Sequence, residues 1–248
     1  MKKLAMIGIF AGLVALLSGC MVVSFDGTGG INAVQGTGDM TTREFDILMD
    51  FTGIEISGNY VVVFRQSPTL AVSVRMQENL FDYLNVGVRN GVLRIDSNRS
   101  FRTGPGYRPR IYVSAPSLDT VILSGASSIE NWDVVAAEAL HITVSGAADG
   151  IIPMAVDTLE VAVAGAADFT LTGTAGTANI SIAGAGDIDA LGLQAANATV
   201  VVTGAGSAYV AASDTLDVTI TGAGTVRYVG NPQVSRTVAG IGSVQRMD

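Results

Sequence analysis

The chain has 248 residues, of which 48% are hydrophobic and 15% are charged, and its formal net charge at pH 7 is −8. Such an acidic chain repels nucleic acid and anionic lipid, which argues against both as partners. A single cysteine excludes an internal disulfide framework, and a single histidine argues against a paired-histidine metal site. The length allows one or two domains.

The first nineteen residues have the layout of a secretory signal peptide. Two lysines precede an apolar run at residues 4–17, and small residues precede Cys20. The apolar run is short for a helix that spans a bilayer. The sequence LSGC also matches the lipobox of bacterial lipoproteins, in which small residues suit the peptidase and the thiol carries a diacylglyceryl group. We therefore expect residues 1–19 to be removed as a lipoprotein signal peptide and Cys20 to be lipidated.

A lipidated Cys20 would hold the mature chain on a membrane through two or more acyl chains, such as diacylglyceryl and palmitate. Met21 follows the cysteine in place of aspartate, which under the common sorting rule favours the outer membrane of a Gram-negative bacterium. Removal of residues 1–19 also removes both lysines, so the net charge becomes 12 − 22 = −10. The alternative is an ordinary signal peptide that ends near an unrelated cysteine.

The rest of the chain divides into three stretches. Residues 20–42 carry the lipidated cysteine and then a glycine- and threonine-rich segment, which we expect to be a flexible tether. Residues 43–116 contain alternating strand-like segments and a short helical turn at 77–84, and form an expected N-terminal β section. Residues 117–248 carry a regular repeat.

The repeat is a glycine that follows an alternating apolar stretch. Apolar and mostly β-branched residues stand four and two positions before the glycine, which predicts a strand with one buried face. The glycines are spaced by 21, 19, 19, 20, 18 and 18 residues, and a constant period near twenty is typical of a solenoid. These glycines are Gly125, Gly146, Gly165, Gly184, Gly204, Gly222 and Gly240.

We expect each repeat to form one coil of an all-β, single-chain parallel β-helix, or β-solenoid, with coils of about 18–21 residues. Stacked coils bury the apolar rows in a shared core, and the usual crossover hand predicts a right-handed helix. An antiparallel sandwich would not require the same corner chemistry at constant spacing. Residues 51–60 carry the repeat in variant form, so the solenoid is expected to begin there. Arg236 in the last apolar row indicates a last coil that frays or caps the end.

The motifs FTGIEISGNY, ENLFDYLNV, GVLRI and IYVSAPSL occur in this order before the repeated SGA(G/A)D corners. By these motifs the chain resembles the GIN-domain family, described as the head domain of auto-transporter adhesins, over nearly all of residues 42–248. The resemblance implies a β-helical cell-envelope protein, often exported or lipid-anchored, without an established catalytic residue. It also implies adhesion as a function.

An aspartate stands three residues after the corner glycine in three successive repeats, at Asp149, Asp168 and Asp187. Carboxylates stacked about 4.8 Å apart repel one another by about 0.9 kcal/mol in bulk water and by more at lower dielectric. Calcium would offset this repulsion, because it accepts carboxylate oxygens in flexible geometry. Serine and threonine occupy the same place in other repeats, which favours a simpler role, the bonding of backbone N–H groups in turns.

The loop at residues 98–110, NRSFRTGPGYRPR, concentrates arginine and aromatic residues. Together these side chains suit sulfated, phosphorylated or uronic polysaccharides. The simpler explanation is a solvated loop whose cations balance the acidic body. The candidate residues for binding a polyanion or glycan are Arg99, Arg102, Arg108, Arg110, Phe101 and Tyr107.

Enzyme chemistry has little support in the sequence. His141 is expected at an outward strand position, and the mature chain has no lysine or unmodified cysteine to act as a nucleophile. Asp187 and Asp189 could serve as acid and base in a polysaccharide lyase or hydrolase, which is the alternative function. We expect instead a lipid-anchored envelope protein without catalytic activity or cofactor that presents a stiff surface to glycans or envelope proteins. A periplasm-facing scaffold is a third hypothesis, and the sequence leaves open which side of the outer membrane the domain faces.

Overall fold

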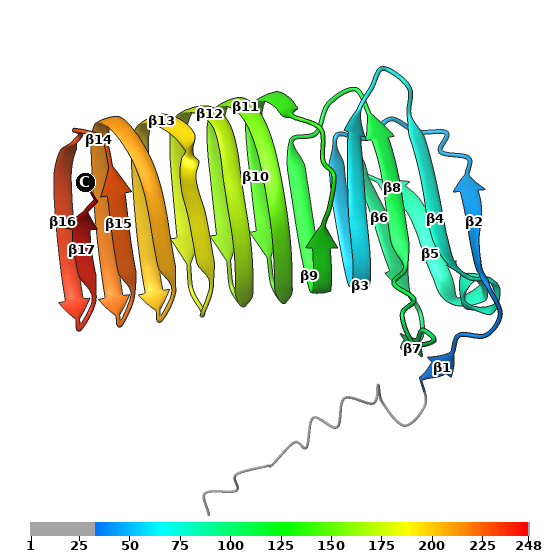
Figure 1. Cartoon of the computed structure of the whole chain (residues 1–248). Coiled ribbons are helices and arrows are strands. Elements are labelled where there is room, and N and C mark those ends of the chain that lie inside the picture. Colours follow the sequence, from blue (N-terminus) through cyan, green and yellow to red (C-terminus); the bar gives the residue numbers. More distant parts are fainter. Residues whose placement is uncertain (1–32, 248) are drawn as a thin grey trace, which may run out of the picture.

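A computed structural model describes residues 33–247, and most of this part of the chain is β-structure stacked along one axis (Figure 1). The architecture is a β-solenoid of about seven turns, so the expected fold class is confirmed. The expected signal peptide and Cys20 lie outside the described residues. The solenoid strands are β3 (Gly53–Gln66), β9 (Thr120–Ile129), β10 (Val135–Val144), β11 (Ala147–Val163), β12 (Ala166–Ile182), β13 (Asp187–Gly204), β14 (Ser207–Gly222), β15 (Thr225–Val229), β16 (Gln233–Gly240) and β17 (Ser243–Arg246).

Neighbouring coils pair in parallel, and their register follows the sequence repeat. Gly58 of β3 lies opposite Gly125 of β9, so the first coil begins at β3, where the variant repeat predicts it. A register shift between Ala190 and Gln194 of β13 accommodates the longer coil at that point. The strands of the central coils run through a bend without a break, which is why each is 16 to 18 residues long.

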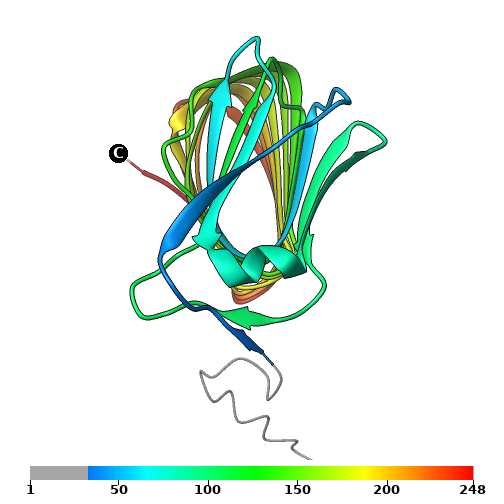
Figure 2. The same cartoon turned by 90° about the vertical axis from the view of Figure 1, so that its right-hand side faces the viewer.

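The apolar rows of the repeat form the core. Seen along the axis, the coils surround one elongated interior (Figure 2). Burial of each valine or isoleucine side chain in these rows contributes about 1.5–3 kcal/mol to the stability of the fold. The solenoid therefore holds together without disulfides. One ladder, whose members are at most 2% exposed, consists of Ile142, Val161, Ile180, Val200 and Val218.

The corner glycines are required by close approach of one coil to the next. A Cβ atom added at Gly165 would overlap the carbonyl oxygen of Gly146, and one added at Gly146 would overlap that of Gly125. Real Cβ atoms do not approach backbone oxygens so closely, so any side chain here would push the coils apart. The repeated small-residue phrase of the sequence is therefore a stacked corner.

A separate group of elements closes the N-terminal end of the solenoid. Strands β8, β4 and β2 extend the sheet beyond β3, with β4 antiparallel to both β8 and β2. The 3-10 helix η1 (Glu78–Tyr83) forms where the helical turn is expected and lies at the capped end (Figure 2). It buries Leu80 and Phe81. The cap strands are β1 (Val34–Gln35), β2 (Met40–Phe45), β4 (Ala71–Gln77), β5 (Leu84–Arg89), β6 (Val92–Ser97), β7 (Phe101–Arg102) and β8 (Arg110–Ala115).

β-structure begins earlier than the expected tether boundary at residue 42. Strand β1 pairs in parallel with β7, and the backbone N–H of Gly36 donates to the carbonyl oxygen of Arg102 at 2.7 Å. Strand β2 then starts at Met40. The segment folds because cap strands far along the chain pair with it. Its own sequence has little apolar alternation, so this pairing could not be predicted from the segment alone.

The last coil ends the solenoid with open strand edges. Among the described strands, β16 pairs only with β14 and β17 pairs only with β15. All eight residues of β16 are exposed. Arg236 lies opposite the buried Val218, so a charge occupies an inward row, flanked by Val234 and Val238. An inward charge on an edge strand discourages pairing with another chain.

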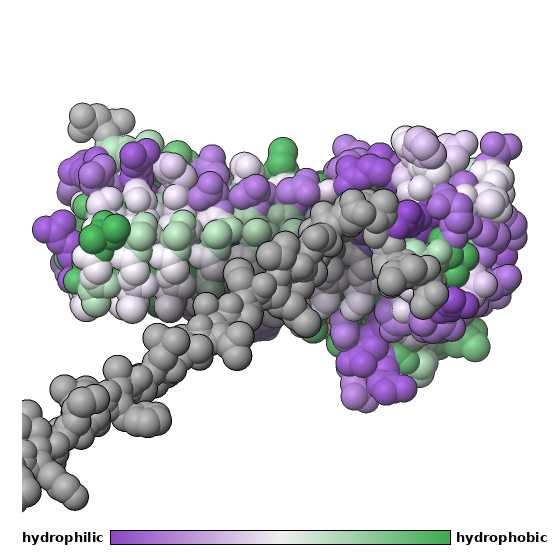
Figure 3. All heavy atoms as spheres, turned by 90° about the horizontal axis from the view of Figure 1, so that it is seen from below, coloured by the Kyte–Doolittle hydropathy of each residue, from purple (hydrophilic) through white to green (hydrophobic). Residues whose placement is uncertain are grey.

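The two ends also differ in surface character. Viewed from below, the solenoid shows regular rows of residues of intermediate to weakly hydrophobic character, whereas more of the cap surface is hydrophilic (Figure 3). Within residues 33–247 no helix has the length and apolar character needed to cross a membrane.

Candidate anion-binding groove

The basic loop at residues 98–110 is held in place from two sides. Its strand β7 pairs with β1, and the backbone N–H of Gly104 donates to Oε1 of Gln77 at 2.9 Å. The Nε2 group of Gln77 donates in turn to the carbonyl oxygen of Gly38 at 2.9 Å. Gln77 is only 2% exposed. One buried amide at the end of β4 therefore links the loop to the N-terminal segment.

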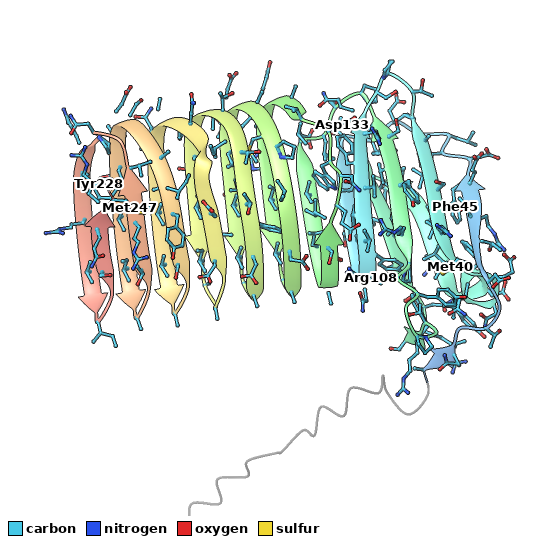
Figure 4. All side chains as sticks on the ribbon, viewed as in Figure 1. Met40, Phe45, Arg108, Asp133, Tyr228 and Met247 are labelled. Carbon is cyan, nitrogen blue, oxygen red and sulfur yellow. The ribbon has the colours of Figure 1, made fainter. Side chains whose placement is uncertain are left out.

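The loop, β2, β4 and β8 surround a groove of about 460 Å³. This volume lies within the usual range of small-ligand sites, roughly 300–1,000 Å³. Met40 and Arg108 both lie on the lower side of the capped end (Figure 4). The lining residues are Asp39, Met40, Arg75, Gly106, Tyr107, Arg108 and Arg110.

Two arginines of this groove lie directly opposite each other in the sheet. Arg75 of β4 is the cross-strand partner of Arg110 of β8. Side chains in such positions have Cβ atoms about 4.5–5.5 Å apart, and like charges there are destabilising. Within residues 33–247, the side chain of Arg75 is exposed and has no hydrogen-bond or ion-pair partner. The pair therefore concentrates positive charge that the protein neutralises only in part.

Arg110 and Arg108 share one carboxylate, that of Glu130. Arg110 Nη1 lies 2.9 Å from Glu130 Oε2, and Arg108 Nη1 lies 3.7 Å from Glu130 Oε1. With Asp39 included, three arginines and two carboxylates give a formal charge of 3 − 2 = +1 at the groove. Guanidinium groups bind phosphate, sulfate and carboxylate through paired hydrogen bonds, so the arrangement is suited to an anionic group.

Comparison with known proteins places the chain in a family. A family model described as "putative auto-transporter adhesin, head GIN domain" matches residues 50–232. The chain belongs to the GIN-domain family. This agrees with the resemblance seen in the sequence motifs. No curated protein matches the chain.

Solved structures share the fold of this GIN domain. A "putative adhesin" from Bacteroides fragilis is 22% identical with a TM-score of 0.78, and the match covers 87% of this chain and 100% of that chain. A "putative adhesin" from Parabacteroides distasonis is 24% identical with a TM-score of 0.69, at the same coverage of both chains. A "putative lipid binding protein" from Parabacteroides distasonis is 25% identical with a TM-score of 0.68, again covering 87% and 100% of the two chains.

The GIN domain brings together only half of the candidate residues of the basic loop. Tyr107, Arg108 and Arg110 line the groove. The other three candidates, Arg99, Phe101 and Arg102, lie earlier in the loop and do not line the groove.

Those three residues have contacts of their own in the cap. The Arg99 guanidinium lies over the Tyr83 ring, 5.8 Å from its centroid. The Phe101 ring packs edge-on against that of Tyr60, with centroids 6.1 Å apart. Arg102 lies on β7. Half of the candidate residues of the loop therefore belong to the structure of the cap.

Asp39, Met40 and Arg75 are groove residues that the sequence analysis missed, and Arg75 is the cationic one among them. It lies in the strand-like segment LAVSVRM, far from the basic loop in the sequence, and only the antiparallel register of β4 and β8 sets it opposite Arg110. The one local signal is a charged residue within an alternating strand segment. That signal is common to many solvated strand faces, so it could not identify the pair.

The three aspartates of the repeat stack on successive coils, as expected, and their row leads to the groove. Arg108 Nη2 donates to Ser128 Oγ at 2.7 Å, and Ser128 Oγ donates to Asp149 Oδ1 at 2.8 Å. The first aspartate of the row is thereby connected to a groove arginine. Neither expected role of this column is visible: Asp168 and Asp187 make no side-chain hydrogen bond with a described residue, so bonds to backbone N–H groups of turns are absent.

The calcium hypothesis for Asp149, Asp168 and Asp187 also lacks a preformed site. Across residues 33–247, no group of three or more histidine, cysteine, aspartate or glutamate residues is placed to hold a metal ion. The three carboxylates are exposed on the outer face of the coils. Water can therefore screen their mutual repulsion, which removes much of the need for a bound cation.

Two of the residues considered for catalysis, Asp187 and Asp189, line one hollow of about 390 Å³ together with Asp168 and Tyr209. Asp187 and Asp189 are both exposed, and Asp189 Oδ1 accepts a hydrogen bond from the backbone N–H of Leu191 at 3.0 Å. His141 Nδ1 lies 2.9 Å from Glu160 Oε2 on the neighbouring coil. The histidine is thus engaged with a carboxylate away from the aspartates. A larger hollow of about 520 Å³, whose lining includes four alanines of β13 and β14, has no charged side chain among its lining residues.

Proposed function

We propose that this GIN domain is a lipid-anchored, non-catalytic module of the outer membrane of a Gram-negative bacterium, which presents a stiff β-solenoid for adhesion to glycans or envelope proteins. The observation that carries the proposal is the place where the chain enters the fold. β1 and β2 belong to the capped end, and the open last coil lies at the opposite end of the axis (Figure 1). A chain anchored at Cys20 reaches the domain at its cap, so the coils would extend away from the anchor.

The fold also supports a presenting role. Each central coil is paired in register along nearly its whole length with the coils on both sides, which makes the rod resistant to bending. Each coil adds about 4.8 Å of reach. Many anchored copies would act together, so weak contacts at single sites would add up to strong avidity.

Lipid anchoring and orientation are tested together by labelling, fractionation and protease shaving. The wild-type chain and Cys20→Ala are expressed in a Gram-negative host with a clickable palmitate analogue. We expect the wild type to take up label, to fractionate with the outer membrane and to be lost when intact cells are shaved, with a periplasmic protein as the integrity control. The C20A variant should lack label and leave the membrane fraction.

Two results would contradict the proposal. Full protection of the wild type during shaving would exclude adhesion at the cell surface and favour the periplasmic scaffold. Release of oligosaccharides from acidic polysaccharides by the purified chain would show that it is a carbohydrate-active enzyme.

A further inference from the structure

We infer that the groove between β2, β4, β8 and the loop at 98–110 binds a sulfate or phosphate ester carried on a sugar ring. The inference rests on the proposed contact with glycans and names the part of the glycan that is recognised. It concerns one site with one anionic group, in contrast to a diffuse basic surface.

The first argument is the uncompensated positive charge. Arg75 and Arg110 face each other across β4 and β8. Among the residues that the structure describes, Glu130 is the only carboxylate paired with Arg110, and it also contacts Arg108. An oxyanion placed between the two guanidinium groups would accept charge-assisted hydrogen bonds from both, and its negative charge would offset their mutual repulsion. Such bonds are roughly twice as strong as neutral ones, and the arginines of the groove supply the donors for them.

The second argument is that the groove is built in advance. The buried amide of Gln77 fixes the loop through Gly104, and Thr103 Oγ1 donates to the carbonyl oxygen of Tyr107 at 2.7 Å. Arg108 is itself held by its bond to Ser128. Donors that are already ordered lose less conformational entropy when a ligand binds, which favours binding.

The third argument concerns the shape and the carrier of the anion. The guanidinium groups come from two strands and a loop, so a tetrahedral ester with three terminal oxygens matches them better than a planar carboxylate. Tyr107, 38% exposed, offers an aromatic face beside Arg108 that suits the apolar face of a sugar ring. Asp39 at the same groove can accept hydrogen bonds from sugar hydroxyls.

Calorimetric titration of the mature full-length chain with small probes tests the site. The probes are glucose 6-sulfate, glucose 6-phosphate, inorganic sulfate and glucose. We expect both esters to bind more tightly than inorganic sulfate, and glucose to bind most weakly. Arg75→Gln should weaken ester binding by at least about tenfold, because it removes the guanidinium that has no internal partner.

Two further variants separate binding from structure. Arg94→Gln is the matched control, because Arg94 is an exposed arginine paired with Glu55 at 2.9 Å outside the groove, and it should leave ester affinity unchanged. Tyr107→Ala should weaken the sugar esters and leave inorganic sulfate unaffected. In the absence of ligand R75Q should unfold at the same temperature as the wild type or higher, because it relieves a like-charge contact.

If R75Q and the wild type bound the esters with equal affinity, the assignment of ester binding to this groove would be wrong. Equal affinity for inorganic sulfate and the esters, with no effect of Y107A, would overturn the assignment to a sugar. Binding to vesicles that contain phosphatidate, without binding to the soluble esters, would assign the groove to a lipid headgroup and overturn the glycan assignment. If the esters bind but shaving shows a periplasmic domain, the inference stands and the proposed adhesin role fails.

Discussion

At the scale of single residues, the corner glycines show how one missing atom permits a repeat. The carbonyl oxygen of Gly146 occupies the space that a side chain at Gly165 would need. The surrounding coils are paired on both sides, so the backbone can give way only by disturbing the ladder. Overpacked positions of this kind usually cost about 1–3 kcal/mol.

We therefore expect Gly165→Ala to lower the free energy of unfolding by about 1–3 kcal/mol, measured by urea denaturation followed by circular dichroism. Gly87→Ala is the control, since a Cβ added at Gly87 of β5 meets no atom within 4 Å. The control should change stability by less than about 0.5 kcal/mol. Equal midpoints for the two variants would show that close approach does not explain the corner glycines.

Tyr60 provides a second residue-scale test. It is 1% exposed, and burial raises the pKa of its hydroxyl above its ordinary value of 10.0, opposed by Ser97 and supported by the nearby Asp96. The hydroxyl has no hydrogen-bond partner of normal geometry among the described residues. The unfolded chain therefore loses this proton near pH 10 while the folded chain keeps it, so the stabilising contribution is present below about pH 10 and is lost as the pH rises further.

We expect the difference in unfolding free energy between the wild type and Tyr60→Phe to shift in favour of the variant between about pH 9 and pH 11. Below that range the variant should match or exceed the wild type, because removal of an unpaired buried hydroxyl is close to neutral. Urea titrations at several pH values measure this difference. A difference that does not change with pH would show that Tyr60 does not keep its proton in the folded state.

At the scale of elements, the exposed edge of β16 carries a protective charge. Arg236 stands in an inward row that is apolar in the preceding coils, and Val234 and Val238 flank it with exposures of 39% and 40%. Without the arginine the edge would present a continuous apolar row beside unpaired backbone groups. Such edges are templates for pairing with another chain.

Arg236→Val should therefore cause self-association that depends on protein concentration, detected by size-exclusion chromatography with light scattering. Thr237→Val, on the opposite face of the same strand, adds a similar apolar side chain and should leave the oligomeric state of the wild type unchanged. Association of both variants to the same degree would mean that general hydrophobicity, and not the inward charge, controls the edge.

The elements also show what the sequence could and could not predict. Strand alternation and corner glycines are local patterns, so the coils from β3 to β17 and the turn at η1 could be predicted. The β1–β7 pairing, the buried Gln77 link and the Arg75–Arg110 pair depend on contacts between distant segments. A local sequence pattern does not encode which distant strands pair or in which register. For this reason only three of the groove-lining residues, Tyr107, Arg108 and Arg110, could be predicted.

At the scale of the whole molecule, each coil contacts mainly its two neighbours along the axis. The stability of such a protein is close to a sum of coil and interface terms. The N-terminal coil is covered by the cap strands and η1, whereas the last coil has a neighbour on one side only. Opening should therefore start at the C-terminal end.

Hydrogen exchange followed by mass spectrometry should show this gradient. We expect amides of β16 and β17 to exchange first and those of β12 and β13 to be the most protected, since the latter strands are paired on both sides. Amides in η1 and β4 should be more protected than those of the last coil. Uniform protection along the axis would indicate that the solenoid opens as one cooperative unit.

The separation of cap and coils has a consequence for how such molecules can diversify. The groove is built from cap elements, with only Glu130 and Ser128 contributed by the first repeats. Duplication of a central coil would lengthen the molecule by about 4.8 Å and leave the groove untouched. Coil number thus acts as a ruler for reach, independent of recognition, so relatives with different coil counts could hold the same site at one end and place their far ends at different heights.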